Sequence, residues 1–307
     1  MKRFLQKILT YFLVYLGIFG ILLFSLGWYL EKDRIYSKKR LLFEKNKKEA
    51  VYIITGTSHT FWGMNPTLFP EKTINIAEKN KPIDIDLKIL ERSIGDFQHA
   101  KYVIIPIDYF TFYFDGHKDN GAAKLYHHWG LPYTDNSFLK KYHITTCGID
   151  PEEIFLNKKA KDKWFGYEAQ KNDYSKVSVA ERNSNYQSRR DLWNKYFIDT
   201  SLAEGIYAKL EHTVALLQSR HIQPVLITMP LDPGFYRALD PALHKKNREL
   251  IGRLVEKTGA PYMDFQENMA FNDLSLFKNQ DHLNDKGTTV LTNLCLAFIR
   301  SIPPVRE

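Results

Sequence analysis

Residues 51–60 read VYIITGTSHT, an apolar run that ends in a turn containing glycine, threonine and serine. An uninterrupted apolar run of this length is typical of a strand that is buried on both faces, as in a parallel sheet. Similar runs recur at residues 73–77, 102–107, 225–229 and 262–265. We therefore predict a core sheet of five mostly parallel strands.

Apolar residues at helical spacing separate these runs. They predict helices over residues 85–94, 202–220, 243–258 and 286–302, the third of which is followed by Gly259, a frequent left-handed cap residue. Strands that alternate with helices predict an α/β fold in which helices cover both faces of a doubly wound sheet. Sheets of this kind place their functional sites outside the carboxyl ends of the strands.

A long uncharged segment precedes this domain. Residues 8–30 contain no Asp, Glu, Lys or Arg, and Trp28 and Tyr29 at its end suit a membrane interface. The segment is longer than the apolar core of a signal peptide, and no small-residue cleavage site follows it. We predict an uncleaved, single-pass membrane anchor over residues 1–30, a basic juxtamembrane connector over 31–50 and a globular domain over 51–303.

The net charge of +8 is confined to the membrane-flanking region. Eleven Lys and Arg residues and three Asp and Glu residues precede Glu49, so the remainder of the chain is neutral. This distribution points to a lipid bilayer as a partner, since cations near a span meet anionic head groups. It argues against a nucleic-acid partner, which would require a basic globular domain.

The middle of the domain, residues 108–200, breaks the alternation of strands and helices and is rich in aromatic residues. A long insert of this kind commonly forms a lid or a binding loop. The alternative is a peripheral subdomain whose aromatic residues pack only against one another. The candidates for a wall over the site are Tyr109, Tyr113, His117, His127, His128, Trp129 and Tyr167.

Ser58 stands directly after the first predicted strand, in the turn that begins at Gly56. A serine there lies at the carboxyl edge of the sheet, and a helix that follows it would direct backbone N–H groups toward a developing oxyanion. A serine hydroxyl needs a base before it acts as a nucleophile. The alternative is that Ser58 only caps the following helix.

A histidine near the end of the domain supplies a candidate base. His282 lies in the polar stretch 277–287, which we predict to be a loop before the last helix. Because the strand ends of a doubly wound sheet share one crevice, this loop can reach Ser58. The alternative is that Asn284 or Asp285 caps the last helix and that His282 lies on the surface.

Together these segments resemble the SGNH/GDSL hydrolase superfamily. The turn of Gly56, Thr57 and Ser58 is similar to the first block of that family, and the stretch 281–284 with Gly287 is similar to its last block. The resemblance is strongest to a membrane-anchored branch that includes the D-alanyl-lipoteichoic acid transfer protein and exopolysaccharide O-acetyltransferase-like proteins. It implies a three-layer α/β/α fold with a flavodoxin-like sheet.

By this resemblance Ser58 is the nucleophile and His282 is the general base. The position of the triad acid, three residues before the histidine, holds Asn279, while Asp281 stands beside His282. An asparagine can orient an imidazole but does not stabilise its charged form as a carboxylate does. The family's oxyanion-hole glycine has no clear counterpart, since the loop that ends at Asn80 occupies its region, and Asp108 is nearest to the family's block-three asparagine. With Gly56 and His59, these residues are the candidates for the pocket and the oxyanion site.

Two functions follow from the resemblance. In the first, the chain is a serine esterase or O-acyltransferase whose partners are an acylated cell-envelope polysaccharide or an acyl donor. In the second, the triad has lapsed, and the protein presents the polymer to an integral membrane acyltransferase. No glycine-rich phosphate loop, zinc-ligand spacing or dinucleotide fingerprint is present, and the two cysteines, Cys147 and Cys295, match no metal pattern. We therefore predict neither a metal nor a cofactor.

The resemblance implies an inner- or plasma-membrane protein whose domain is extracytoplasmic. The basic cluster after residue 30 argues for the reverse orientation, because cations prefer the cytoplasmic side of a span. We expect the outward orientation, since such a cluster can also bind lipid head groups of the outer leaflet.

Overall fold

The structure, a computed structural model of the chain, describes residues 2–32, 35–114, 125–126, 128–131, 165–197 and 201–303. Its centre is a sheet of five parallel strands in the order β2-β1-β3-β4-β5. The strands are β1 (Tyr52–Ile54), β2 (Thr73–Asn75), β3 (Tyr102–Pro106), β4 (Gln223–Thr228) and β5 (Tyr262–Asp264). This is the flavodoxin-like strand order, so the predicted fold class is confirmed.

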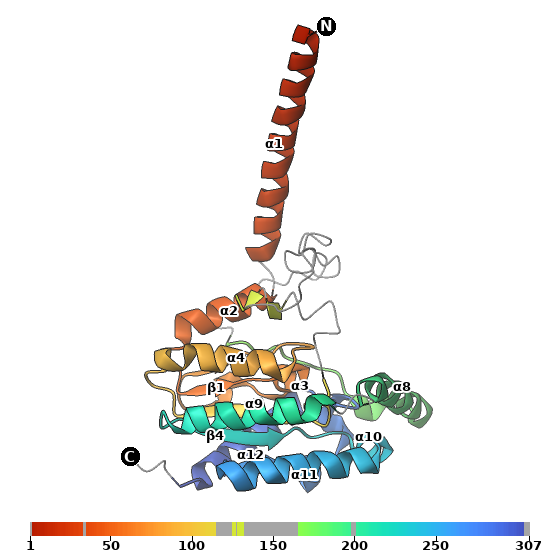
Figure 1. Ribbon diagram of the computed structural model, residues 1–307. Coiled ribbons are helices and arrows are strands. Elements are labelled where there is room, and N and C mark those ends of the chain that lie inside the picture. The colour runs from red at the N-terminus through yellow and green to blue at the C-terminus, as the bar shows by residue number, and fades with distance from the viewer. Residues whose placement is uncertain are drawn as a thin grey trace.

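Helices cover both faces of the sheet (Figure 1). In the described part of the chain they are α1 (Lys2–Lys32), α2 (Ile35–Asn46), α3 (Ser58–Gly63), α4 (Ile83–Ser93), α8 (Val179–Phe197), α9 (Ser201–Gln218), α10 (Pro233–Ala238), α11 (Pro241–Thr258) and α12 (Asp285–Ser301). Short 3-10 turns occupy η1 (Pro66–Leu68), η2 (Ile94–Asp96), η4 (Tyr174–Lys176), η5 (Met269–Phe271) and η6 (Leu274–Leu276).

Successive strand residues point to opposite faces, and this alternation builds two cores. Ile53 packs in one core with apolar residues of α4, α9 and α11, whereas the next residue, Ile54, packs in the other core with α12. Val103 and Ile104 of β3 divide between the two cores in the same way. Burial on both faces explains why the strands are continuous apolar runs rather than alternating ones.

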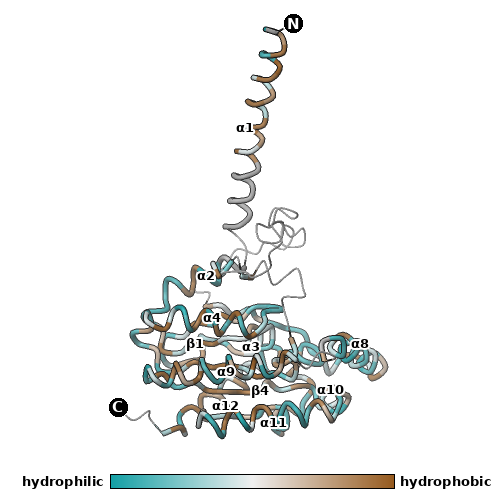
Figure 2. The backbone as a smooth tube through the Cα atoms, viewed as in Figure 1, coloured by the Kyte–Doolittle hydropathy of each residue, from teal (hydrophilic) through white to brown (hydrophobic). Residues whose placement is uncertain are grey.

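α1 projects away from the α/β body (Figure 1), and apolar residues line the part of it that is coloured by hydropathy in Figure 2. It is the one helix in the described ranges that is long and apolar enough to cross a bilayer, with its most apolar window at Arg3–Leu22. A signal sequence near the N-terminus meets the same criterion. The next helix, α2, packs on the body, because its Phe43 is fully buried in the first core.

Two elements differ from the sequence-based expectation. The stretch predicted as a polar loop before the last helix contains an antiparallel hairpin of β6 (Phe277–Asn279) and β7 (His282–Leu283). Within the insert, residues 179–197 form the polar helix α8, for which we predicted no element. Three residues named in the prediction, His117, His127 and Cys147, lie outside the described residues.

Candidate active site

The turn between β1 and α3 places Ser58 at the carboxyl end of the sheet. The strand order reverses between β1 and β3, and Ser58 lies beside this switch point. Gly56 has φ +116°, and a Cβ atom on it would lie 2.3 Å from Cγ of Pro106, so the turn requires a glycine. Thr57 caps α3 by accepting the N–H of His59 at 3.3 Å. Ser58 is thus the first residue of the helix, and its N–H lacks an intrahelical acceptor.

The β6–β7 hairpin places His282. Oδ1 of Asn279 accepts the backbone N–H of Asp281 at 3.2 Å and that of His282 at 2.9 Å, which fixes the turn of the hairpin. Asn284 follows as the cap of α12 and accepts the N–H groups of Lys286 and Gly287. The capping alternative considered for this segment therefore holds for Asn284, while His282 is buried rather than on the surface.

The two predicted catalytic side chains meet. Nε2 of His282 lies 2.8 Å from Oγ of Ser58, and Nδ1 lies 3.0 Å from Oδ1 of Asn279. Because Oδ1 already accepts two backbone N–H groups, it is an acceptor, and Nδ1 must carry the proton. The lone pair of neutral His282 is then on Nε2 and faces the hydroxyl of Ser58. This is the tautomer that a general base requires.

Asp281 provides the negative charge that Asn279 lacks. Its Oδ1 lies 2.9 Å from Nδ1 of His282, although its direction is not that of a hydrogen bond. Its Oδ2 accepts from Nε of Arg189 at 2.5 Å and from the hydroxyl of Tyr109 at 3.3 Å. Burial raises the pKa of this carboxyl group, but the neighbouring His282 ring and the guanidinium of Arg189 outweigh burial and hold the pKa of Asp281 well below its usual range.

A second buried histidine, His59, lies between two carboxylates. Its Nδ1 is 3.2 Å from Asp108, and its Nε2 is 3.7 Å from Asp281. Burial alone would lower the pKa of His59, but the two carboxylates outweigh it and raise the pKa to about 9. His59 is therefore an imidazolium at neutral pH. Its charge compensates that of Asp108, which on its own would oppose an oxyanion.

His282 has the opposite shift. Burial lowers the pKa of His282 to about 4, and the nearby charge of His59 acts in the same direction against the partial compensation from Asp281. The two imidazole rings meet edge to face with their centroids 4.9 Å apart. His282 is consequently neutral at neutral pH and can accept a proton.

Of the four predicted oxyanion and pocket residues, His59 and Asp108 lie at the site, whereas Gly56 and Asn80 do not offer a group to a substrate. The N–H of Gly56 donates to Oδ2 of Asp86 at 3.0 Å, so it does not face a substrate. Asn80 is exposed in a turn with φ 55°, a left-handed conformation that favours glycine. His59 and Asp108 are both buried at the site. The N–H of Ser58 in the first turn of α3 is the donor that the local geometry offers to an oxyanion.

The insert contributes to the site in part. Tyr109 and Arg189, one at each end of its described portion, both bind Asp281. Tyr113 and Trp129 are instead buried in the first core, and the hydroxyl of Tyr167 donates to Asp285 at 2.5 Å. Nothing in the sequence marked Arg189, because it belongs to a polar helix with no motif around it.

His59, Asp281 and His282 place three potential metal-ligand atoms within 4.8 Å of one another. Each of these groups already has another role, since Nε2 of His282 faces Ser58 and Asp281 binds the guanidinium of Arg189. A metal ion beside Arg189 and the charged His59 would be repelled. The arrangement fits proton transfer better than metal binding.

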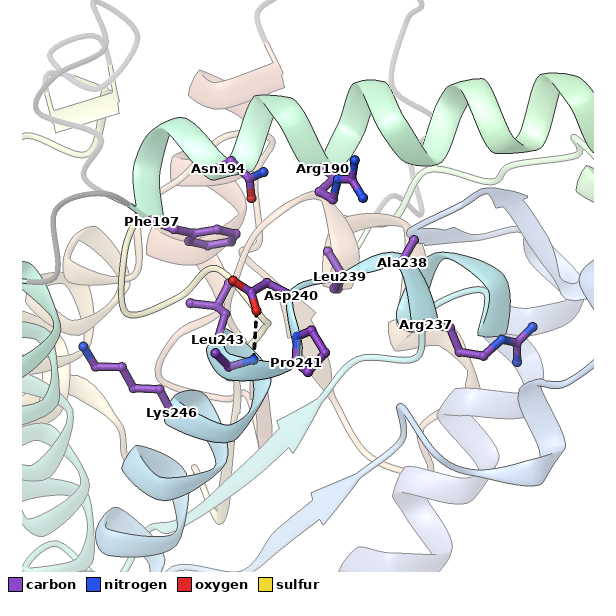
Figure 3. Close-up of a pocket in the computed structure, with 11 residues that line it drawn as sticks. Arg190, Asn194, Phe197, Arg237, Ala238, Leu239, Asp240, Pro241, Leu243 and Lys246 are labelled. Atoms are coloured by element: carbon purple, nitrogen blue, oxygen red, sulfur yellow. Dashed lines mark hydrogen bonds between the residues drawn. The ribbon is translucent and has the colours of Figure 1, made fainter.

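A groove lies elsewhere in the described part of the chain, between α8 and the α10–α11 junction (Figure 3). Its volume is about 780 Å³. Figure 3 shows Arg190 and Asn194 of α8 facing Asp240 and Leu243 across it. Arg189, the residue before Arg190, reaches Asp281, so α8 contacts both the groove and the candidate site.

No protein-family model matches the chain, and no curated protein matches it. Among solved structures it is similar to a presumed acylhydrolase from Bacteroides fragilis, with 13% identity, a TM-score of 0.39 and coverage of 83% of this chain and 88% of the other. It is also similar to an acetylxylan esterase from Geobacillus stearothermophilus, solved as a catalytic mutant, with 14% identity, a TM-score of 0.39 and coverage of 83% of this chain and 96% of the other. An α/β hydrolase from a Lake Arreo metagenome has 14% identity, a TM-score of 0.38 and coverage of 84% of this chain and 99% of the other. These values are too low to support an activity, so the functional proposal rests on the geometry of the site.

Proposed function

We propose that the chain is a serine-dependent ester hydrolase or O-acyltransferase that acts on acylated cell-envelope polysaccharide. The observation that supports this most strongly is the alignment of Ser58, His282 and Asn279 through contacts of 2.8 and 3.0 Å. Serine nucleophiles need a neutral, oriented base at this distance. Asn279 orients the imidazole, and Asp281 stabilises its charge, so two residues share the task of the usual triad acid.

The reaction would proceed in two steps. Oγ of Ser58 attacks the ester carbonyl while Nε2 of His282 takes the hydroxyl proton, and the N–H of Ser58 binds the oxyanion. His282 then gives the proton to the departing alcohol, which leaves an acyl group on Ser58. In the second step His282 deprotonates water or a sugar hydroxyl, which attacks the acyl-enzyme. His282 then returns this proton to Oγ of Ser58 as the bond between the acyl group and Ser58 breaks. Hydrolysis and transfer differ only in this acceptor.

The cellular setting is part of the proposal. α1 would anchor the protein in the inner or plasma membrane, as its length and apolar composition allow. The domain would lie on the extracytoplasmic side, where acylated envelope polysaccharides occur. An alkaline phosphatase fused to the C-terminus should then be active in cells. An inactive fusion beside an active cytoplasmic reporter at the same position would reverse the orientation.

Release of acetate from an O-acetylated polysaccharide tests the activity. The full chain in a neutral detergent should release acetate, or transfer it to an added oligosaccharide, and Ser58→Ala should abolish both reactions while leaving the unfolding temperature unchanged. Activity that survives in Ser58→Ala would refute the proposed nucleophile. A folded wild-type chain without activity would favour the alternative in which the site has lapsed and the protein presents polymer to a membrane acyltransferase.

A further inference from the structure

Two lysines from separate segments lie over one aromatic ring beside the candidate catalytic histidine. Nζ of Lys278, on β6, is 3.5 Å from the centroid of the Trp62 indole, and Nζ of Lys79, in the turn after β2, is 4.9 Å from it. The same indole meets the ring of His282 edge to face at 4.8 Å. Two cations therefore converge on a ring that contacts the candidate catalytic histidine. We call Lys79 and Lys278 the lysine pair.

Neither member of the lysine pair has a carboxylate within ion-pair distance among the described residues. Two carboxylates act on Lys278 from beyond that distance: Asp281, and Glu168, whose Oε2 accepts the indole N–H of Trp62 at 3.3 Å. Burial, together with the charge of Lys79, lowers the pKa of Lys278, which is half-buried. By contrast Lys81, a few residues away, is paired with Asp86 at 2.6 Å. The lysine pair thus brings two like charges together on one ring, and Asp281, one of the two carboxylates that act on Lys278, is already bound to Arg189.

Cation–π contact with Trp62 accounts for part of this arrangement. It does not account for two ammonium groups on one ring, because their mutual repulsion reduces the gain of each. An anion at this position would relieve the repulsion and receive charge-assisted hydrogen bonds from both groups. The place of the lysine pair beside His282 means that such an anion would belong to the molecule entering the site.

We propose that Lys79 and Lys278 bind a carboxylate or phosphate group carried by the glycan close to its acyl ester. This inference names a substrate class for the proposed esterase or acyltransferase and rests on that function. The lysine pair would select glycans that carry an anion near the ester and would place that ester against Ser58. Neutral acylated glycans would lack this contact.

The test measures binding without turnover, in the full chain with Ser58→Ala in a neutral detergent. The probes are an oligogalacturonide, a phosphorylated oligosaccharide and a neutral oligogalactose of the same length, titrated at low and moderate salt. We expect at least one anionic probe to bind more tightly than the neutral one. Lys79→Gln with Lys278→Gln should weaken that binding by about tenfold or more, the scale of a hydrogen bond to a charged group, and should remove its salt dependence.

The matched control is Lys209→Gln with Lys246→Gln, which removes the same charge from two exposed lysines. Lys246 also lines the groove of Figure 3. Equal binding by the lysine-pair variant and the parent, at equal unfolding temperature, would overturn the inference. So would a loss of binding in the control variant instead, which would place the anion in the groove.

Two further outcomes separate this inference from its rivals. Binding that depends on the lysine pair but occurs only with vesicles of anionic phospholipid would assign these residues to the membrane surface and overturn the inference. A chain that cleaves no ester, yet binds anionic oligosaccharides through the lysine pair, would refute the proposed enzyme while supporting the binding site. Failure of the two proposals is therefore distinguishable.

Discussion

The two buried histidines of the site, His59 on α3 and His282 on the β6–β7 hairpin, have similar burial but opposite electrostatics. Both approach Asp281, and their rings are 4.9 Å apart. His59 also contacts Asp108, and its pKa rises to about 9, whereas burial lowers the pKa of His282 to about 4. The number of carboxylates around each ring decides which histidine carries the charge.

This difference assigns separate tasks to the two residues. His282 is neutral and faces Ser58, which suits a base, whereas His59 is a fixed cation that allows Asp108 and Asp281 to be buried close together. An imidazolium beside Asp281 also disfavours a second positive charge on His282. His282 therefore accepts a proton only when a reaction supplies one, and Asp281 then stabilises it.

The largest expected effect comes from His282. His282→Gln should lower kcat/KM for an acetyl ester by about 10⁴-fold or more, because the variant removes the general base without which Ser58 is a weak nucleophile. His59→Gln should reduce it far less, since the ring in hydrogen-bond contact with the Ser58 hydroxyl is that of His282. Steady-state hydrolysis of p-nitrophenyl acetate measures both. An equal loss in the two variants would show that the histidines do not divide their tasks as described.

The next largest effect tests how Asn279 and Asp281 share the task of the triad acid. Asp281→Asn removes the charge beside Nδ1 and should lower kcat by about 10²-fold, within the range of general-base contributions. Asn279→Asp keeps the acceptor for both backbone N–H groups and supplies a charge of its own, so it should retain activity. Asp273→Asn, at an exposed cap, is the control. An inactive Asn279→Asp variant beside an active Asp281→Asn variant would reverse this assignment.

Stability provides the third comparison. His59→Gln leaves Asp108 and Asp281 buried without the cation between them, and loss of one partner of a buried ion pair costs about 3 kcal/mol of unfolding free energy. Denaturant unfolding at pH 7 measures the change, and His99→Gln, at an exposed histidine, is the control. A variant as stable as the wild type would mean that His59 is not charged in the folded state.

The smallest effect is a pH dependence of stability. Because the folded-state pKa of His59, about 9, exceeds its ordinary value of 6.5, the stabilisation is fully present below pH 6.5 and is lost as the pH rises through 9. Its slope is at most about 1.4 kcal/mol per pH unit for one proton. His59→Gln should lack this decline. A wild-type unfolding free energy that stays constant between pH 7 and pH 9 would contradict the raised pKa.

Much of the fold was predictable because its signals are local. The continuous apolar run at residues 51–54 predicted a buried strand, and Gly259 ends α11 with φ 65°, as a left-handed cap residue should. Ser58 and His282 were also identifiable, since each adjoins a predicted element at the carboxyl edge of the sheet. A doubly wound sheet brings both to one edge, while the β6–β7 hairpin, which was not predicted, sets their contact at 2.8 Å.

The electrostatics of the site were not predictable, because they depend on contacts between distant segments. The ion pair of Asp281 with Arg189 joins the hairpin to α8, a helix without apolar periodicity. The position of His59 between Asp108 and Asp281 likewise needs three segments of the fold. The resemblance placed Asn279 at the position that orients the imidazole, but nothing near it in the sequence indicated that its Oδ1 would also accept two backbone N–H groups.

Covalent labelling of Ser58 most directly tests whether His282 activates it. A fluorophosphonate probe, added to the full chain in a neutral detergent, should attach once, and peptide mass spectrometry should place the adduct on Ser58. Labelling should vanish in Ser58→Ala and slow sharply in His282→Gln at equal unfolding temperature. A folded wild-type protein that stays unlabelled, or one that reacts equally fast with and without His282, would contradict the account.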